Sequence, residues 1–297
     1  MKKILMISIL IFIGITVNAK ENEQIFLKNI NGAEMTKTQY NNLLKGFTHD
    51  TIITLPKDTI DSLKNDTSLR KVSKTKYVKI LTYYENKKII GVSEEEITSN
   101  EFDEITAGSP VYYSTGLGGA TSEKVETNYK KITLTITSGA TITAKHVTLT
   151  NFWKTIPKIK SYDVMAIAPG VDSISFNLSG HRSGYQKWDG KMVNYDMNSQ
   201  NWNIIDKSGI FKKGIGLSQN LVDATTTTLE NSMTVTFVCG RSPFIVRGSY
   251  QHAITNLSLA ESKKYTLGSD GMGNLIIFDS KIKDKYDKTP GVTATLN

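Results

Sequence analysis

Residues 131–150 read KITLTITSGATITAKHVTLT, and this stretch decides the fold class. Ile132, Leu134 and Ile136 alternate with polar residues, which is the period of two expected for a half-buried strand. The pair Ser138–Gly139 is a turn signal, and a second alternating segment follows it. The stretch therefore predicts two antiparallel strands with one apolar face and one polar face.

The chain after residue 129 repeats this pattern in short segments. Threonine, valine, isoleucine and tyrosine are frequent in them, and glycine, proline or asparagine lies between them. We therefore expect residues 129–297 to form an antiparallel β-sandwich, jelly-roll-like or barrel-like in its topology. The further strand segments are 162–168, 172–178, 232–238, 244–250, 253–259 and 274–279.

The first third of the chain differs in charge and in period. Residues 20–105 carry 13 Lys+Arg and 14 Asp+Glu, whereas residues 106–297 carry 21 and 14. Helical spacing over residues 38–45 and the proline at position 56 predict two short helices. Alternation over residues 74–98 then predicts a hairpin. The mixture indicates a small α+β module over residues 20–105.

Residues 106–128 join the two parts and are rich in glycine, serine and threonine. Gly116, Gly118 and Gly119 would suit a phosphate-cradling loop, but such a loop needs a preceding strand, a following helix and a fuller spacing. The composition therefore favours a linker.

The first 19 residues have the composition of an export signal. Lys2 and Lys3 precede the apolar run Ile4–Val17, and Ala19 suits the position before a cleavage site. The run has 14 residues, fewer than the roughly 20 that a membrane-spanning helix needs. We therefore expect a signal peptide over residues 1–19, cleavage after Ala19, a secreted, extracellular chain, and no transmembrane span after cleavage.

The stretch Met35–Phe47 reads MTKTQYNNLLKGF, and a threonine-rich turn, a second short helix and a hairpin ending in EEEIT follow it. Residues 35–98 resemble a segment near the start of exported Gram-positive bacterial proteins of uncharacterised function. The resemblance implies export and a recurring small module. It implies no activity and no catalytic residue.

Cysteine and histidine residues are too few and too scattered for a disulfide framework or a local metal motif. Cys239 follows Met233, Val235 and Phe237 on one face of an alternating segment, which predicts a buried thiol. The four histidines lie far apart in the sequence. We therefore expect no metal, no cofactor and no catalytic residue.

Residues 181–203 read HRSGYQKWDGKMVNYDMNSQNWN and form the most site-like segment. Aromatic rings alternate there with amides and carboxylates, which suits stacking on a sugar ring and hydrogen bonding to its hydroxyls. The Asp-Gly pair at 189–190 is a strong hairpin signal, so a hairpin with cross-strand aromatic pairs is a compatible interpretation. The candidate ligand-binding residues are Tyr185, Trp188, Asp189, Tyr195 and Trp202.

Three functions remain open. A non-catalytic binding or interaction protein at or outside the cell envelope comes first, because no catalytic spacing stands out. A secreted hydrolase acting on envelope polymer or glycan would need two carboxylates across a cleft, such as Asp189 and Asp196. A pore-forming protein would use residues 131–150, whose alternation suits a pair of membrane strands.

The net charge of +8 favours weak attraction to anionic surfaces such as teichoic acid or lipid headgroups. The lysines occur singly or in pairs rather than in larger clusters, so nucleic acid is not an expected partner. An envelope polymer or a glycan is the expected partner. The charged tail Lys281–Lys288 is expected to be a solvated last segment.

Overall fold

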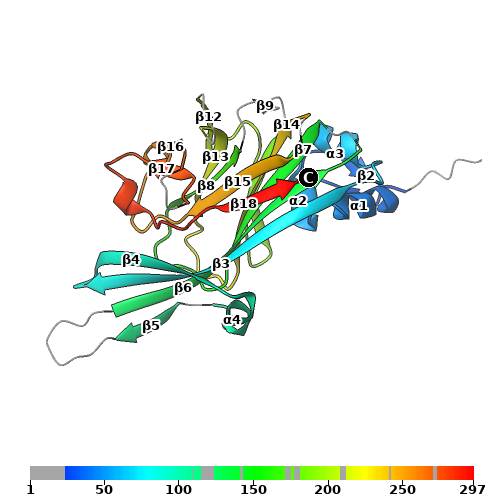
Figure 1. The fold of residues 1–297 in the computed structure, drawn as a ribbon. Coiled ribbons are helices and arrows are strands. Elements are labelled where there is room, and N and C mark those ends of the chain that lie inside the picture. The colour runs from blue at the N-terminus through cyan, green and yellow to red at the C-terminus, as the bar shows by residue number, and fades with distance from the viewer. Residues whose placement is uncertain are drawn as a thin grey trace, which may run out of the picture.

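A computed structural model describes most of the chain, and half of the described residues are in strands and 14% in helices. The sheets are antiparallel, so the predicted mainly β class is confirmed (Figure 1). The expected signal peptide lies outside the described residues, and no helix within them is long and apolar enough to cross a membrane. The described residues are 24–108, 110–114, 124–140, 143–170, 175–176, 181–207, 212–240, 242–269 and 273–297.

The first sheet has nine strands within the described residues. They are β3 (Arg70–Glu85), β4 (Lys88–Ile97), β5 (Val111–Ser114), β6 (Lys124–Ser138), β7 (Ala144–Trp153), β9 (Ser175–Phe176), β10 (Arg182–Trp188), β11 (Lys191–Tyr195) and β14 (Leu229–Val238). The strand order is β11-β10-β14-β7-β6-β3-β4, with β5 also paired to β6 and β9 to β14. The stretch 131–150 thus supplies most of two central strands.

The second sheet has five strands in the described part of the chain, in the order β12-β13-β8-β15-β18. These are β8 (Tyr162–Pro169), β12 (Trp202–Asp206), β13 (Lys213–Asn220), β15 (Phe244–Gln251) and β18 (Val292–Leu296). Smaller elements are α4 (Ser99–Glu104), α5 (Leu259–Ser262), β16 (Tyr265–Leu267), β17 (Ile276–Phe278) and the 3₁₀ helix η1 (Lys283–Lys285). The strand predicted over 253–259 is wrong: Ser258 caps α5 through a capping box with Glu261.

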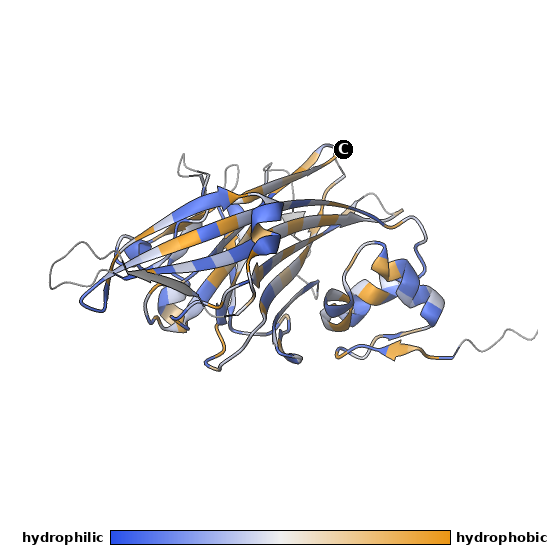
Figure 2. Ribbon diagram, turned by 90° about the horizontal axis from the view of Figure 1, so that it is seen from below, coloured by the Kyte–Doolittle hydropathy of each residue, from blue (hydrophilic) through white to orange (hydrophobic). Residues whose placement is uncertain are grey.

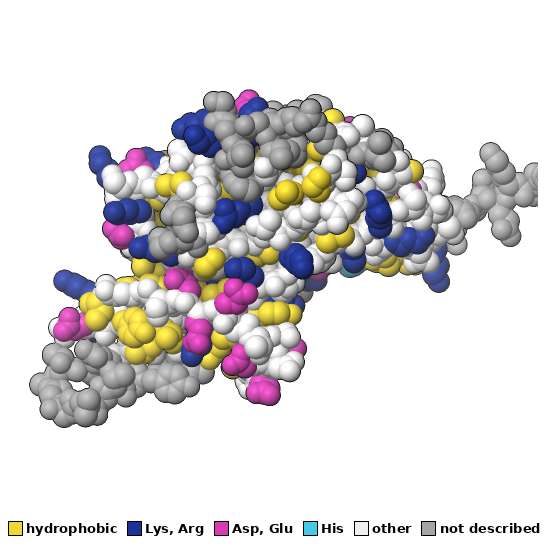
Figure 3. Space-filling model, in the orientation of Figure 1, with side chains coloured by type: hydrophobic (Ala, Val, Ile, Leu, Met, Phe, Trp, Pro, Cys, Tyr) yellow, Lys and Arg dark blue, Asp and Glu magenta, His cyan; other side chains and the backbone are white. Residues whose placement is uncertain are grey.

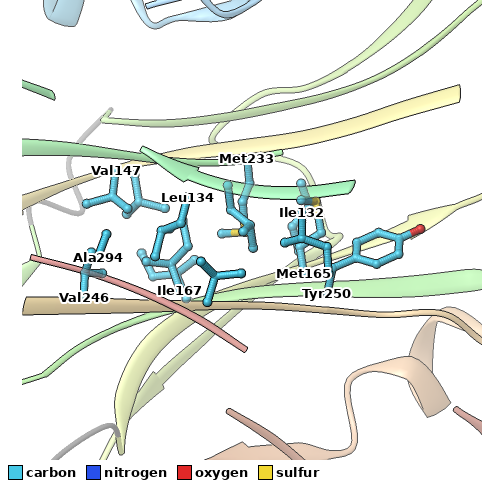
Figure 4. Packing of buried hydrophobic residues seen from close by; sticks show 14 of the residues in the cluster. Ile132, Leu134, Val147, Met165, Ile167, Met233, Val246, Tyr250 and Ala294 are labelled. Atoms are coloured by element: carbon cyan, nitrogen blue, oxygen red, sulfur yellow. The ribbon is translucent and has the colours of Figure 1, made fainter. Parts of the chain in front are cut away.

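The main core lies between the two large sheets. Figure 4 shows Ile132, Leu134, Val147 and Met233 of the first sheet facing Met165, Ile167, Val246 and Ala294 of the second. All of these side chains are buried, which is what alternation with a period of two dictates for the inner face of a sandwich. Each large apolar side chain contributes about 1.5–3 kcal/mol by its burial.

A helical module, residues 24–69, precedes the sandwich. It contains β1 (Leu27–Lys28), β2 (Glu34–Met35), α1 (Lys37–Leu44), α2 (His49–Thr54) and α3 (Lys57–Leu63). Thr36 and Gln39 form a capping box at the start of α1, and Leu43, Ile52 and Ile60 belong to a separate apolar cluster. The module lies at one end of the sandwich, whose strands alternate in hydropathy along their length (Figure 2).

The predicted hairpin over 74–98 exists, but it belongs to the first sheet of the sandwich. β3 pairs with β6 from Arg70 opposite Ser138 to Tyr84 opposite Lys124. One sheet therefore crosses the division that the sequence suggested at residues 106–128, and part of that expected linker is β5 and the first residues of β6. Residues 109 and 115–123 of the expected linker lie outside the described residues.

Candidate functional site

The segment 181–203 forms the predicted hairpin. β10 pairs with β11 from Gly184 opposite Tyr195 to Trp188 opposite Lys191, and the turn between them is Asp189–Gly190. Both turn residues have positive φ, 42° and 78°, as the primed hairpin turns require. The turn signal in the sequence therefore predicted the position of this hairpin turn correctly.

The aromatic residues of this hairpin and of β12 face inward. Tyr185, Tyr195 and Trp202 are each at most 9% exposed, and Trp188 is half-buried against the main core. The Tyr185 hydroxyl donates to Glu230 Oε1 at 2.6 Å, and the Trp202 Nε1–H donates to a backbone carbonyl. These three buried rings stabilise the interior and present no open face on which a sugar could stack.

Asp189 stabilises the neighbouring loop that contains Thr227 and Thr228 by accepting hydrogen bonds from it. Its Oδ1 accepts hydrogen bonds from the backbone N–H groups of Thr227 and Thr228, at 3.1 and 3.2 Å, and from both hydroxyls at 3.1 Å. Hydrogen bonds from the Thr226 side chain, and then from Thr227 and Thr228, lower the pKa of the Asp189 carboxyl to about 2. Asp196 accepts a backbone N–H from Asn198. Asp189 and Asp196, the two carboxylates of the hydrolase hypothesis, thus accept hydrogen bonds that stabilise turns.

The structure instead forms a cleft of about 170 Å³ between the helical module and the outer face of the first sheet. We call it the hydroxyl-lined cleft, because six threonines contribute to its walls: Thr48 and Thr51 of the module, Thr133 and Thr135 of β6, and Thr148 and Thr150 of β7. Its volume is smaller than the roughly 300–1,000 Å³ of pockets that hold drug-sized ligands, so it admits one sugar-sized group at a time.

The register between β6 and β7 places the hydroxyls of four threonines side by side. Thr133 lies opposite Thr150, and Thr135 lies opposite Thr148, so all four project from the same face. Thr135 is 2.8 Å from the Ser73 hydroxyl, and Thr148 is 2.9 Å from that of Thr234. Since a hydroxyl offers one donor and two acceptor positions, each of these paired groups keeps capacity for a ligand.

The cleft also contains rings and charges. Phe152 contributes a partly exposed apolar wall, with the buried Phe47 ring behind the cleft, and Lys71 and Lys131 contribute ammonium groups. The Lys131 Nζ lies 5.5 Å from the centre of the Phe152 ring. A ring beside hydroxyls and ammonium groups is a combination that can pack on a sugar face and hydrogen-bond to its substituents.

Glu230 lines the cleft beside Tyr185. Burial raises the pKa of the Glu230 carboxyl above its ordinary value, and the Asp50 carboxylate adds to the rise, while the Tyr185 hydroxyl and the ammonium groups of Lys187 and Lys131 oppose it. A carboxyl group with a raised pKa in a cleft is a feature of functional sites. Glu230 is not among the site residues predicted from the sequence, although alternation along β14 places it on the same face as Ser232 and Thr234.

Polar contacts fix the helical module over the sheet. Lys187 Nζ pairs with Asp50 Oδ2 at 2.6 Å, joining β10 to α2. The Thr137 hydroxyl donates to the Gly46 carbonyl at 2.7 Å, and Thr59 contacts His181 at 3.0 Å. These contacts hold the wall of the cleft that Thr48 and Thr51 form, and no local sequence pattern indicates them.

Among the described residues, no group of three or more His, Cys, Asp or Glu side chains could hold a metal ion. Cys239 is buried, as its place on an alternating strand predicts. His146 is also buried; burial lowers its pKa to about 4, with His181 and Lys145 adding to the effect. Its Nδ1 lies 2.9 Å from the Thr236 hydroxyl.

The sequence matches no protein-family model and no curated protein. Among solved structures, the chain is similar to the collagen-binding domain from a Staphylococcus aureus adhesin. The two are 8% identical with a TM-score of 0.26, and the match covers 52% of this chain and 87% of the adhesin domain. At this score the likeness says nothing about what the present chain binds.

Proposed function

We propose that this chain is an exported, non-catalytic binding protein that holds a glycan or another hydroxyl-rich envelope polymer in the hydroxyl-lined cleft. The observation that carries the proposal is the gathering of six threonines, two lysines and one partly exposed phenylalanine ring, Phe152, around one cleft. Sugars present hydroxyls that both donate and accept, and threonine side chains do the same.

The charge of the chain supports the same class of ligand. Lys71 and Lys131 lie at the cleft, and the whole chain carries a net charge of +8. Such a balance attracts anionic polymers, because the summed field raises their concentration near the surface. The export signal expected over residues 1–19 would deliver the chain to the compartment where envelope polymers occur.

Binding accounts for the geometry better than hydrolysis does. A glycosidase needs two carboxyl groups facing each other across the substrate, roughly 5–9.5 Å apart. Asp189 and Asp196 are engaged in turns. Glu230 lines the cleft, but the neighbouring Asp50 is occupied by its ion pair with Lys187.

Binding also accounts for the geometry better than pore formation does. β6 and β7 alternate apolar and hydroxyl side chains, as pore hairpins do. They are, however, central strands with partners on both sides, and Ile132, Leu134 and Leu149 lie in the main core. Releasing this hairpin would break the first sheet in two and expose the core.

The test is retention of residues 20–297 on peptidoglycan, teichoic acid and a glycan array, followed by calorimetric titration of whatever binds. The informative variant is Thr133→Val with Thr135→Val, because their partners Thr75 and Ser73 are exposed and lose no buried contact. Two hydrogen bonds at about 0.5–1.5 kcal/mol each predict a Kd about 5-fold to 140-fold weaker.

The matched control is Thr293→Val with Thr295→Val, two exposed threonines at the same spacing on β18 of the second sheet. Valine suits strands, so both double variants should keep their melting temperature. Failure of all three surfaces to retain the chain would contradict the proposal, as would equal affinity of the two double variants.

A further inference from the structure

A lysine and an aspartate meet in the interior of the protein, away from the hydroxyl-lined cleft. The Lys130 Nζ of β6 lies 2.5 Å from Asp287 Oδ2, and both side chains are fully buried. The faces of two rings also lie beside this ammonium, with the ring centres of Trp153 and Tyr250 at 5.3 and 5.1 Å. Both groups therefore lie where a charged form loses its hydration.

The two carboxylate oxygen atoms of Asp287 have different partners. Oδ1 accepts the backbone N–H of His252 at 2.9 Å, whereas Oδ2 faces the Lys130 ammonium. Because a C–O bond is about 1.2 Å long, the Asp287 Cγ lies within about 3.7 Å of Lys130 Nζ. Reacting atoms in a near-attack arrangement are roughly 3–3.5 Å apart. The amine nitrogen and the carboxyl carbon are thus close to reacting distance.

Glu94 of β4 brings a third titratable group to this pair. Its Oε1 accepts the backbone N–H of Lys288, the residue after Asp287, at 2.7 Å. Burial raises the pKa of the Glu94 carboxyl, and the Asp287 carboxylate adds to the rise, while the Lys288 N–H and the Lys130 ammonium oppose it. A carboxyl group in this setting can accept a proton and pass it on.

Glu94 also connects the buried pair to the surface. Together with Tyr84, Ile89 and Val92 it lies on the face of the β3–β4 hairpin that lines a recess of about 780 Å³. Figure 3 shows the surface in this region, where hydrophobic side chains gather between the hairpin and the main body, with charged side chains beside them. A water molecule released beside Glu94 can leave through this recess.

We propose that Lys130 and Asp287 condense to form an amide bond between their side chains. One proton moves from the ammonium to Oδ2, the neutral Nζ attacks Cγ, and Glu94 carries a second proton from Nζ to Oδ2. Oδ2 departs as water, and Oδ1 becomes the amide oxygen that still accepts the His252 N–H. One ammonium and one carboxylate give one amide and one water, so the step needs no further reactant.

The bond would give the fold a cross-link that it cannot obtain from cysteine. The chain has a single cysteine and therefore no internal disulfide. Lys130 lies on β6 of the first sheet, and Asp287 precedes β18 of the second, 157 residues further along the chain. A cross-link that closes so long a loop restricts the unfolded chain strongly. The amide also removes two buried charges and their desolvation cost.

The test is the intact mass of residues 20–297, measured after purification and again after prolonged incubation. Condensation should lower the mass by that of one water. Trypsin does not cleave after an acylated lysine, so digestion should yield a branched peptide that joins residues 125–131 to residues 286–288. Dehydration at an Asp-Gly sequence such as Asp189–Gly190 removes the same mass but joins no two peptides, so the branched peptide is decisive.

The Lys187–Asp50 pair is the internal control for burial. Its charged atoms lie 2.6 Å apart, but both side chains are partly exposed. Hydration favours the charged forms there, so no branched peptide should contain this pair. A second control is the variant Lys130→Met with Asp287→Asn, which lacks the amine and should keep the full mass of its sequence.

The role of Glu94 is tested with Glu94→Gln. Glutamine keeps an oxygen that can accept the Lys288 N–H but cannot carry the proton, so condensation should be about a hundredfold slower or more, with an unchanged circular dichroism spectrum. Because the buried lysine and aspartate should remain an ion pair in this variant, it is the background in which the energy of the ion pair itself is measured.

Three results would overturn the proposal or part of it. A folded parent protein that keeps its full mass after prolonged incubation would show that the pair does not condense. A branched peptide that joins Lys130 to Glu94 would assign the bond to the wrong carboxyl group here. Equal rates of condensation in the parent and in Glu94→Gln would exclude Glu94 as the proton carrier.

Discussion

Replacing Lys130 by methionine is expected to lower the free energy of unfolding by about 3–5 kcal/mol, because it leaves the buried Asp287 carboxylate without its counterion. The Lys130 Nζ lies 2.5 Å from Asp287 Oδ2, and both side chains are fully buried. The same ammonium lies 5.3 Å from the Trp153 ring centre and 5.1 Å from that of Tyr250. The loss of these cation–π contacts adds to the effect.

The second variant, Lys130→Met with Asp287→Asn, removes both charges and keeps the side-chain oxygen that accepts the His252 N–H. Replacing both members of a buried ion pair by neutral groups of similar size is close to neutral. The double variant should therefore recover most of the stability that Lys130→Met loses, and a double-mutant cycle gives the coupling energy directly.

The assay is urea denaturation followed by tryptophan fluorescence and far-ultraviolet circular dichroism, with coincidence of the two transitions as the test of two-state unfolding. A loss of 3–5 kcal/mol corresponds to a drop in melting temperature of roughly 6–20 °C for a chain of this size. A loss below about 1 kcal/mol for Lys130→Met, or a double variant less stable than either single variant, would refute the reasoning.

Two further predictions concern Glu230 and Gly184. Burial, with a contribution from Asp50, raises the pKa of Glu230 above 4.5, so its contribution to stability is present below about pH 4.5 and is lost as pH rises through the folded-state pKa. Glu230→Gln should make the decrease in the free energy of unfolding between about pH 4 and about pH 8 smaller than in the parent protein, as measured by the urea midpoints at the two pH values. An equal decrease in the two proteins would contradict this. A Cβ at Gly184 would lie 2.5 Å from Leu217 Cδ2 and 2.9 Å from the Ser232 carbonyl oxygen, so Gly184→Ala should cost about 1–3 kcal/mol in thermal unfolding. Gly240→Ala, where the Cβ meets nothing within 4 Å, is the control and should leave stability nearly unchanged.

Much of the fold could be predicted from local patterns. Alternation at Ile132, Leu134 and Ile136 identified a buried strand face, and all three are fully buried. The Asp-Gly pair at 189–190 located a hairpin turn. Period and turn chemistry act within a few residues, so a sequence reports them directly.

Pairing between distant strands could not be predicted in the same way. A period of two says which side chains share a face, but not which strand lies beside which. β3 and β4 therefore looked like part of a separate module, although β3 pairs with β6. The prediction that Lys281–Lys288 is solvated is wrong for the same reason, because Asp287 is buried against Lys130, 157 residues away.

The candidate site was visible only in part. The alternating threonines of 131–150 stand out in the sequence, and they form one wall of the hydroxyl-lined cleft. The other wall comes from the helical module through contacts such as the Lys187–Asp50 ion pair, which no spacing reveals. The aromatic-polar pattern suggested that the Tyr185 ring stacks on a ligand. The ring is buried by distant parts of the chain, which a local pattern does not reveal.

The long ladder between β3 and β6 also has a consequence for synthesis. Residues 70–85 leave the ribosome well before residues 124–138. During that interval the edge of β3 that later pairs with β6 has no partner, and a lone hairpin is only marginally stable. Charged residues at such a flank discourage aggregation. Lys76 and Lys79 of β3 pair with Glu96 and Glu95 of β4, so these ion pairs can form within the lone hairpin and keep charged groups on it before β6 is added.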